Sequence, residues 1–167
     1  MEGKKTNYRL TRPRVLLVFG APCSGKTTFA KKFAEKFRLA FYDLDEIKNS
    51  NEFSEKQLLN ILELISRTGQ NLIFEGCLET EKQRDEIRKV FRIAGYDPSL
   101  IWIQTDLSTI RSRLKARHKS VAKAKEMYDT AIATFEAPSE IEMPIILSGK
   151  HTFDTQAKHV ITALADN

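Results

Sequence analysis

The chain has 167 residues, of which 41% are hydrophobic and 29% charged, proportions typical of a single folded domain. No apolar run reaches the length of a membrane span, the basic N-terminal residues lack the apolar stretch of a secretory signal, and two cysteines make no disulfide framework, so we expect a cytoplasmic protein. The net charge of +5 is concentrated in residues 1–14, with five bases and one acid, and in 107–125, with seven bases and no acid, so that the rest of the chain carries −6.

The first predicted element is a strand. Residues 15–19 form an uninterrupted apolar run, which is the pattern of a strand buried on both faces. Phe29, Phe33 and Phe37 then recur every four residues and predict one face of a helix over 26–37. Similar apolar runs predict further strands at 39–43, 72–74, 100–103 and 145–147. Between and after these strands, apolar residues recur at helical spacing and predict helices.

Signals at the helix ends agree with these stripes. Ser54 and Gln57 fit a capping box at the start of one helix. Asp106 or Ser108 can cap the basic helix further along, and Pro138 ends the helical segment that follows it. Strands and helices therefore alternate, which predicts the α/β class: a three-layer fold with a five-stranded parallel sheet between helices.

The chain shows no repeat, low-complexity segment or internal linker. We therefore expect a basic N-terminal tail at 1–14 and one domain at 15–167. Within that domain, the basic segment at about 107–125 is a candidate helical lid.

The segment between the first strand and the first helix fits the phosphate-binding P-loop, G-x-x-x-x-G-K-[ST]. Its glycines let the backbone turn around an anion, so that successive N–H groups and the positive end of the helix face the phosphates. Lys26 would place its charge on the β- and γ-phosphates, and the Thr27 hydroxyl would bind Mg²⁺. The motif predicts nucleotide binding by Gly20, Ala21, Pro22, Cys23, Ser24, Gly25, Lys26, Thr27 and Thr28.

Other segments narrow the class of P-loop protein. No guanine-specifying Asn-Lys-x-Asp follows the fourth or fifth predicted strand, which argues against a GTPase. Glu75 and Gly76 follow the strand at 72–74, where large motor ATPases carry two acids, and 167 residues leave no room for an oligomerising lid domain. A small phosphotransferase remains.

Three acids follow predicted strands at the sheet edge that holds the P-loop. Asp43 and Asp45 would leave an extended strand on the same side, where one could hold Mg²⁺ through water and the other could accept the proton of an attacking hydroxyl. The alternative is a loop in which Asp45 caps a helix from Glu46 onward. Glu75 is equally compatible with holding Mg²⁺-bound water and with a structural hydrogen bond.

The basic segment offers further ligands for phosphate. Arg113 and Arg117 lie four residues apart on one helix face, opposite Ile110 and Leu114. Guanidinium groups bind a phosphoryl group bidentately, and a mobile lid that carries them would exclude water. The alternative is a solvated helix face, but seven bases without an acid form a biased run. We therefore expect Arg113 and Arg117 to take part in catalysis.

Together these residues resemble the small P-loop kinases of the adenylate-kinase-like branch, which include shikimate and gluconate kinases, polynucleotide 5′-kinase domains and many AAA-type predicted kinases. The resemblance covers 15–165 and rests on GAPCSGKT, FYDLD, an FEG followed by a helix containing Arg84, IWIQTDLSTIRSRLKAR and FEAP. It implies strand order 2-3-1-4-5, ATP as phosphoryl donor and a lid arginine that stabilises the transferred group.

The resemblance also implies roles for single residues. Asp45 matches the acceptor-side aspartate and Asp43 the magnesium-side aspartate. Arg113 matches the lid arginine near adenine and Arg117 the one near the phosphates, although these two could be exchanged. The loop at 148–152 would wrap the adenine edge.

Two departures bear on the acceptor. Glu75, Gly76 and Cys77 stand where shikimate kinases have three glycines, and no arginine lies between Arg38 and Arg67, where nucleoside-monophosphate kinases grip the acceptor phosphate. The leading hypothesis is therefore ATP-dependent phosphorylation of a hydroxyl on a small metabolite, by a monomer or dimer. The alternatives are a polynucleotide 5′-hydroxyl kinase, which would make nucleic acid the less favoured partner, and a nucleotide-binding regulatory ATPase.

Overall fold

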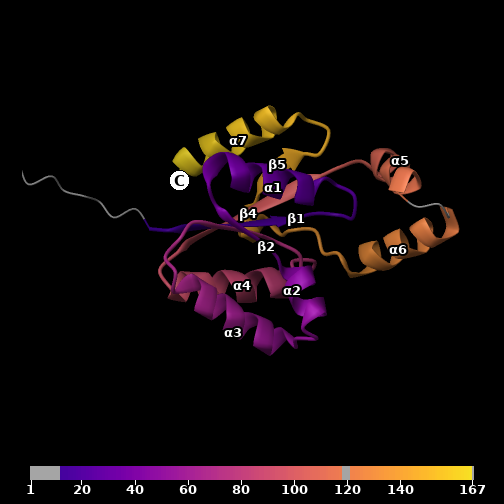
Figure 1. Cartoon of the computed structure of the whole chain (residues 1–167). Helices are drawn as coiled ribbons and strands as arrows, with labels where there is room; N and C mark the ends of the chain where they lie inside the picture. The colour runs from indigo at the N-terminus through magenta and orange to yellow at the C-terminus, as the bar shows by residue number, and fades with distance from the viewer. Residues whose placement is uncertain (1–11, 118–120, 167) are drawn as a thin grey trace, which may run out of the picture.

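The computed structural model describes residues 12–117 and 121–166, and a parallel sheet lies at its centre (Figure 1). The strands are β1 (Arg14–Phe19), β2 (Ala40–Asp43), β3 (Leu72–Glu75), β4 (Asp97–Gln104) and β5 (Ile145–Ser148). They lie in the order β2-β3-β1-β4-β5, and every neighbouring pair is parallel. The predicted fold class and strand order are confirmed.

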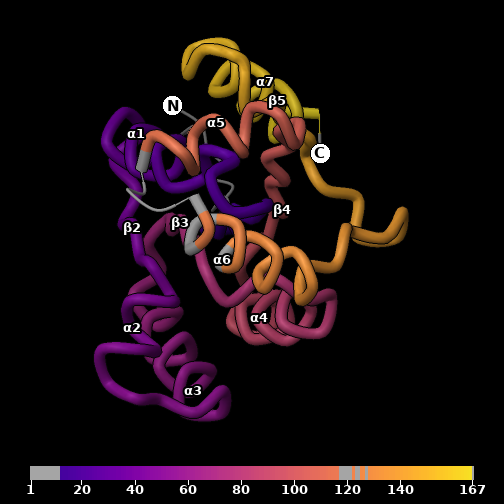
Figure 2. Tube along the Cα trace, turned by 90° about the vertical axis from the view of Figure 1, so that its right-hand side faces the viewer, coloured from indigo at the N-terminus to yellow at the C-terminus, as the bar shows by residue number. Residues whose placement is uncertain are grey.

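Helices cover both faces of the sheet. In chain order they are α1 (Lys26–Phe37), α2 (Leu44–Ser50), α3 (Glu55–Ser66), α4 (Glu81–Ile93), α5 (Leu107–Arg117), α6 (Val121–Thr134) and α7 (Phe153–Ala165), with a 3-10 turn at Glu140–Glu142. α1 and α7 lie on one face, and α3 and α4 lie on the other (Figure 1). α5 and α6 project from the main body (Figure 1), toward the viewer in Figure 2, and the face of α5 that carries Ile110 and Leu114 packs against Ala21 and Cys23 of the P-loop and Tyr128 of α6.

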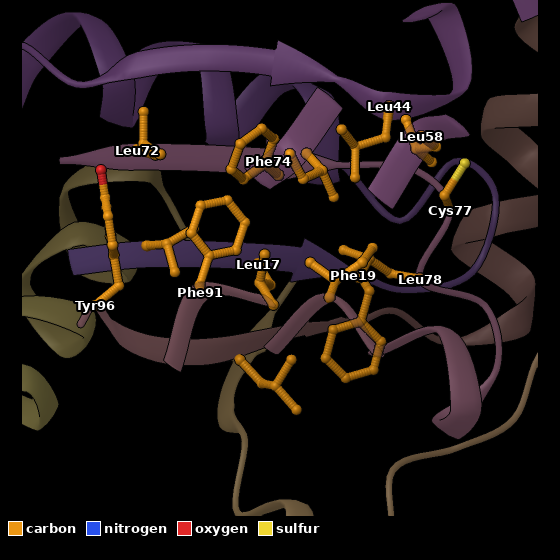
Figure 3. Packing of buried hydrophobic residues seen from close by; sticks show 14 residues of the cluster. Leu17, Phe19, Leu44, Leu58, Leu72, Phe74, Cys77, Leu78, Phe91 and Tyr96 are labelled. Carbon is orange, nitrogen blue, oxygen red and sulfur yellow. The ribbon is translucent and has the colours of Figure 1, made fainter. Parts of the chain in front are cut away.

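The central strand β1 supplies both halves of the core because its side chains alternate between two buried faces. Leu17 and Phe19 pack with Phe74 on the side of α3 and α4 (Figure 3). Leu16 and Val18 pack on the opposite side, against α1 and α7. No residue of the run 15–19 is more than 2% exposed, which confirms the strand that its apolar pattern predicts.

The helix caps agree with the sequence signals. Ser54 and Gln57 form the predicted capping box, in which the Gln57 side chain accepts from the Ser54 amide at 2.9 Å. Asp106 is the residue that caps α5, since its carboxylate accepts from the Thr109 amide at 3.0 Å and also contacts the Ser108 hydroxyl. In the described part of the chain, no helix is long and apolar enough to cross a membrane.

Two elements differ from the predictions. β4 begins at Asp97, three residues before the predicted strand. α2 follows β2 directly and begins at Leu44, whereas a helix here was predicted only as the alternative for Asp45, from Glu46 onward. Of the predicted basic tail, residues 1–11 lie outside the described residues, and Arg14 is the first residue of β1.

Candidate functional site

The P-loop forms the turn between β1 and α1, in the strand–loop–helix context that the motif requires. Gly25 precedes α1 with a φ of +106°, a conformation that favours glycine. A side chain at Gly20 would place its Cβ 2.5 Å from the carbonyl oxygen of Ile103 on β4. The loop therefore needs its first glycine for close packing against the sheet and its second for the backbone turn.

Glu75 lies at the end of β3, level with Val18 on β1 and Asp43 on β2. Its side chain is 2% exposed, and neither carboxylate oxygen accepts a hydrogen bond from the residues that the structure describes. Burial raises the pKa of Glu75, and the Thr27 hydroxyl and the Lys26 ammonium oppose that rise. This buried carboxylate therefore lies at the end of the P-loop, beside the Thr27 hydroxyl and the Lys26 ammonium.

The residues around Glu75 suit a hydrated magnesium ion. Thr27 supplies a hydroxyl, and Asp43 and Glu75 supply carboxylates that could hold its water ligands. Among the described residues, no three His, Cys, Asp or Glu side chains are grouped closely enough to hold a metal by themselves. That donor set fits Mg²⁺, which keeps several waters and takes further oxygen ligands from a nucleotide.

Asp43 and Asp45 do not leave β2 on the same side, because the chain turns into α2 at Leu44. Asp43 is the N-cap of that helix: its Oδ1 accepts from the amides of Asp45, at 3.0 Å, and Glu46, at 3.1 Å. The prediction of an extended pair is therefore wrong, and so is the alternative in which Asp45 is the cap. Asp45 instead sits in the first turn of α2.

A tight turn after β3 holds the Asp45 carboxylate. Asp45 Oδ1 accepts from the Cys77 amide at 3.0 Å and from the Cys77 thiol at 3.3 Å. Gly76 and Cys77 have φ values of +80° and +52°, and a Cβ on Gly76 would lie 2.7 Å from Asp45. Burial, together with the Asp45 carboxylate, raises the pKa of the Cys77 thiol to about 12. Cys77 is therefore a hydrogen-bond donor to Asp45, a role that the sequence motifs did not reveal.

Arg113 ties the basic helix to the P-loop. Its Nη1 donates to the carbonyl oxygens of Cys23, at 3.0 Å, and Ser24, at 3.1 Å, while Nη2 donates to Gly149 at 2.9 Å. The Arg117 side chain lies outside the described residues, as do residues 118–120 of the predicted lid. Arg113 therefore joins two backbone loops beside the P-loop.

A cavity of about 370 Å³ lies beside this junction. Gly149, in the loop predicted to wrap adenine, is packed so closely that a Cβ would meet Thr105 and the Ser24 carbonyl oxygen, the latter at 2.4 Å. The cavity's position next to the P-loop suits the base and ribose of a nucleotide. Its lining residues include Gly25, Thr28, Phe29, Arg113, Gly149 and Phe153.

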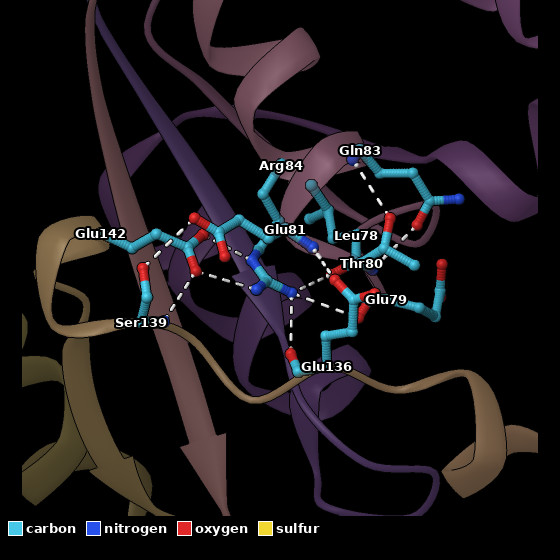
Figure 4. A network of polar contacts seen from close by, with 9 residues as sticks. All are labelled: Leu78, Glu79, Thr80, Glu81, Gln83, Arg84, Glu136, Ser139 and Glu142. Atoms are coloured by element: carbon cyan, nitrogen blue, oxygen red, sulfur yellow. Dashed lines mark hydrogen bonds and ion pairs between the residues drawn. The ribbon is translucent and has the colours of Figure 1, made fainter.

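Arg84 is buried in a polar network that connects α4 to the segment after α6 (Figure 4). Its Nε and Nη2 donate to the two carboxylate oxygens of Glu142, at 2.7 and 2.9 Å. Nη1 donates to the carbonyl oxygens of Leu78, Glu79 and Glu136, at 3.0 to 3.2 Å. With 0% exposure, Arg84 has no donor directed to solvent or to a ligand. Its role in these contacts is structural.

Known proteins share this fold. A family model described as "AAA domain" matches residues 15–138. A sugar kinase from Janibacter sp. HTCC2649 is 20% identical, with a TM-score of 0.70, and the match covers 92% of this chain and 95% of that one. The Mycobacterium tuberculosis APS kinase CysC, in complex with AMPPNP and APS, is 21% identical with a TM-score of 0.68, and the match covers 92% of this chain and 98% of that one.

Kti12 from Chaetomium thermophilum, in complex with ADP-AlF3, is 14% identical with a TM-score of 0.71, and the match covers 91% of this chain and 97% of that one. A comparison with curated proteins finds no match. At these identities the likeness concerns the fold, and the match spans nearly the whole of each structure.

Proposed function

This chain belongs to the AAA domain family, and we propose that it is an ATP-dependent phosphotransferase that moves the γ-phosphoryl group to a hydroxyl of a small metabolite. The observation that carries the proposal is the meeting of three parts at one sheet edge. The P-loop, the buried Glu75 carboxylate and the Asp45 carboxylate held by Cys77 all lie there. A protein that only bound a nucleotide would need the first of these and not the last.

On the donor side, the P-loop amides and Lys26 would hold the phosphates and offset the charge that spreads over the transferred group. Thr27, Asp43 and Glu75 would hold Mg²⁺, which when bound neutralises phosphate charge. Arg113 is a positioning residue, since its contacts fix the P-loop against the loop at Gly149. ATP is supported as the donor by the structural neighbours solved with AMPPNP and ADP-AlF3.

On the acceptor side, the substrate hydroxyl oxygen would attack the γ-phosphorus. A new P–O bond forms as the bond from the γ-phosphorus to the β–γ bridging oxygen breaks, ADP leaves, and the hydroxyl proton passes to Asp45. Asp45 suits this role because the Cys77 amide and thiol fix one of its oxygens, while its other oxygen has no hydrogen bond from the described residues. Asp43 is assigned to the Mg²⁺ side instead, because it lies level with Glu75 at the end of β2.

The decisive test is transfer of labelled γ-phosphate from ATP to a panel of alcohols, with a 5′-hydroxyl oligonucleotide included. We expect a phosphorylated small molecule, and Lys26→Ala should lower the rate by about 100-fold or more because the charge on the phosphates is lost. Lys158→Ala, which removes an exposed lysine on α7, is the matched control and should keep full activity. Full transfer by Lys26→Ala would contradict the mechanism.

A nucleotide-hydrolysing protein without a small acceptor is the second candidate. It is favoured by one observation, the likeness to Kti12 over 91% of the chain. It predicts tight ATP binding and slow hydrolysis with no labelled product from any alcohol or oligonucleotide. The same panel therefore separates the two functions.

A further inference from the structure

A second cavity lies at the β5 end of the sheet, and the proposed donor and acceptor sites do not use it. Its volume is about 850 Å³, within the range of pockets that hold small organic ligands. Residues of β4, β5, α5, α6 and α7 line it. Because β5 is the last strand and pairs only with β4, the cavity lies at an open edge of the sheet, where a small molecule can enter.

Much of the cavity wall is apolar. Trp102 and Ile146 are register partners on β4 and β5, so their side chains lie on the same face of the sheet. Ile132 of α6 and Phe135 just after that helix also line the cavity. Ile132 and Ile146 are 38% and 47% exposed. Covering them would remove apolar surface from water, which favours a ligand with an apolar body.

Asp106 is the single acid among the described residues that line the cavity, and its oxygens already have partners. The Lys150 ammonium pairs with this carboxylate at 2.6 Å. The carboxylate also contacts the Ser108 hydroxyl and accepts from the Thr109 amide at 3.0 Å and the Thr109 hydroxyl at 2.9 Å. The contact with Lys150, followed by those with Ser108 and Thr109, holds the pKa of Asp106 well below its ordinary value. Asp106 therefore caps α5 and has little capacity left for a ligand.

Three basic side chains of the cavity, in contrast, have unused donors. The Lys150 ammonium carries three protons, and Asp106 is its one partner among the described residues. The imidazole rings of His151 and His159 line the cavity, and neither makes a hydrogen bond or an ion pair with the part of the chain that the structure describes. A neutral imidazole donates from one nitrogen and a protonated one from both. These donors suit an anionic group, because no free acid among the described lining residues competes for them.

The nucleotide would not occupy this cavity. The cavity of about 370 Å³ beside Arg113, assigned above to base and ribose, shares only His151 with it among the described lining residues. A nucleotide in the smaller cavity would therefore leave the Trp102 wall of the larger one uncovered.

We propose that the cavity of about 850 Å³ binds an organic anion with an apolar body, such as a carboxylate on a hydrocarbon chain, and that Lys150 binds its anionic group. The body would cover Trp102, Ile132 and Ile146. A cationic ligand would meet Lys150 without a free carboxylate to offset it, and a small inorganic anion would leave the apolar wall uncovered. The proposal concerns binding at a separate site and does not depend on the proposed function.

The chain carries its own probe, because Trp102 is its only tryptophan. Binding in the cavity can be followed through the single indole N–H signal in NMR spectra of the full, ¹⁵N-labelled chain. Octanoate, 1-octanol and octylamine share one hydrocarbon body and differ in charge. We expect octanoate to shift the signal saturably, with a Kd about tenfold lower than that of 1-octanol, and octylamine to bind more weakly than either.

Several outcomes would overturn the proposal. One is the absence of a saturable shift with octanoate, and another is equal or tighter binding of 1-octanol or octylamine. A Kd for octanoate that rises in proportion to the concentration of AMPPNP and Mg²⁺ would place octanoate in the nucleotide cavity instead. A Trp102 signal that shifts with protein concentration in the absence of any ligand would show that a second copy of the chain covers the cavity.

Two variants separate the anionic group from the apolar body. Lys150→Gln should raise the Kd of octanoate about tenfold and leave that of 1-octanol unchanged, whereas Lys158→Gln, at an exposed lysine of α7 outside the cavity lining, should change neither. Ile132→Asp should weaken both ligands by about tenfold or more, and Ile93→Asp, at an exposed isoleucine of α4, should weaken neither. An unchanged Kd of octanoate in Lys150→Gln overturns the role of Lys150, and unchanged Kd values in a folded Ile132→Asp variant overturn the location of the site.

Discussion

Glu75 shows how a single residue can be unfavourable for folding and useful for function. A buried carboxylate without a hydrogen-bond partner opposes folding, because its ionised form loses the solvation that it has in the unfolded chain. The fold tolerates the group beside Thr27 and Lys26, where a hydrated cation and phosphates would compensate it. The residue is thus explained by the ligands that we propose.

The raised pKa of Glu75 gives a prediction for Glu75→Gln. In the absence of nucleotide and metal, a carboxylic acid whose pKa is higher in the folded than in the unfolded state makes the folded protein less stable as pH rises. The loss begins near pH 4.5, the ordinary pKa of the group, and continues up to its pKa in the folded state. The free energy of unfolding of Glu75→Gln relative to the native chain should therefore increase between about pH 4 and pH 8 in urea titrations.

With ATP and Mg²⁺ present, the native chain should instead have the higher free energy of unfolding of the two. The Glu75→Gln variant should also need about tenfold more Mg²⁺ for half-maximal activity. Glu35→Gln serves as the control and should show neither effect. A pH-independent difference in stability would mean that Glu75 is not buried in its ionised form.

The placement of single residues was predicted correctly from the sequence where all the residues of a motif are consecutive in the chain. The strand–loop–helix setting of Lys26 and Thr27 follows from eight consecutive residues. The contact between Asp45 and Cys77 could not be predicted in that way, since it depends on two residues after β3 with positive φ and on close packing of Gly76 against α2.

At the scale of elements, Arg113 connects α5 with two loops that are distant in sequence. Its planar guanidinium reaches three carbonyl oxygens at once, which a lysine ammonium on a flexible stem cannot reproduce. We expect Arg113→Lys to weaken binding of a fluorescent ATP analogue by about tenfold, because the P-loop and the loop at Gly149 lose their common donor.

Arg111→Lys is the matched control, since Arg111 is exposed on the same helix. Equal losses in both variants would show that the effect does not come from the contacts that Arg113 makes with the two loops. A loss confined to Arg113→Lys would support the positioning role.

Element boundaries were predictable where side-chain periodicity was strong. The observed ranges of α1 and α3 agree with the helical spacing of their apolar residues. α2 has only seven residues, too few for such a spacing to be recognised. The start of β4 was missed because Asp97 and Pro98 are disfavoured in strands. Pro98 is tolerated there because β5 joins β4 only from Ile101 onward, so that at Pro98 the strand has β1 as its single neighbour.

For the whole molecule, the pair Arg84–Glu142 joins α4 to the segment that returns from α6 to β5. Burial alone would raise the pKa of Glu142, but the Arg84 guanidinium and the Ser139 amide outweigh it and hold the pKa below its ordinary value. Arg84→Met should lower the free energy of unfolding in urea by about 3–5 kcal/mol, because Glu142 is left buried without its partner.

The double variant Arg84→Met/Glu142→Leu should recover part of that loss, since the unpaired charge is gone while three carbonyl groups still lack their donor. Lys82→Met, which breaks the exposed pair with Glu86, should change stability by less than about 1 kcal/mol. A double variant less stable than Arg84→Met would contradict this explanation.

The place of β1 has a consequence for how the protein is made. β1 lies between β3 and β4, so Val15 pairs with Leu72 on one side and Pro98 on the other. During synthesis the most apolar strand therefore leaves the ribosome before either of its neighbours exists. One edge of β1 can pair only after β3 has followed, and the other only after β4 has followed. Until then residues 15–19 are an apolar segment without its partner strands, which is the kind of segment through which a nascent chain aggregates.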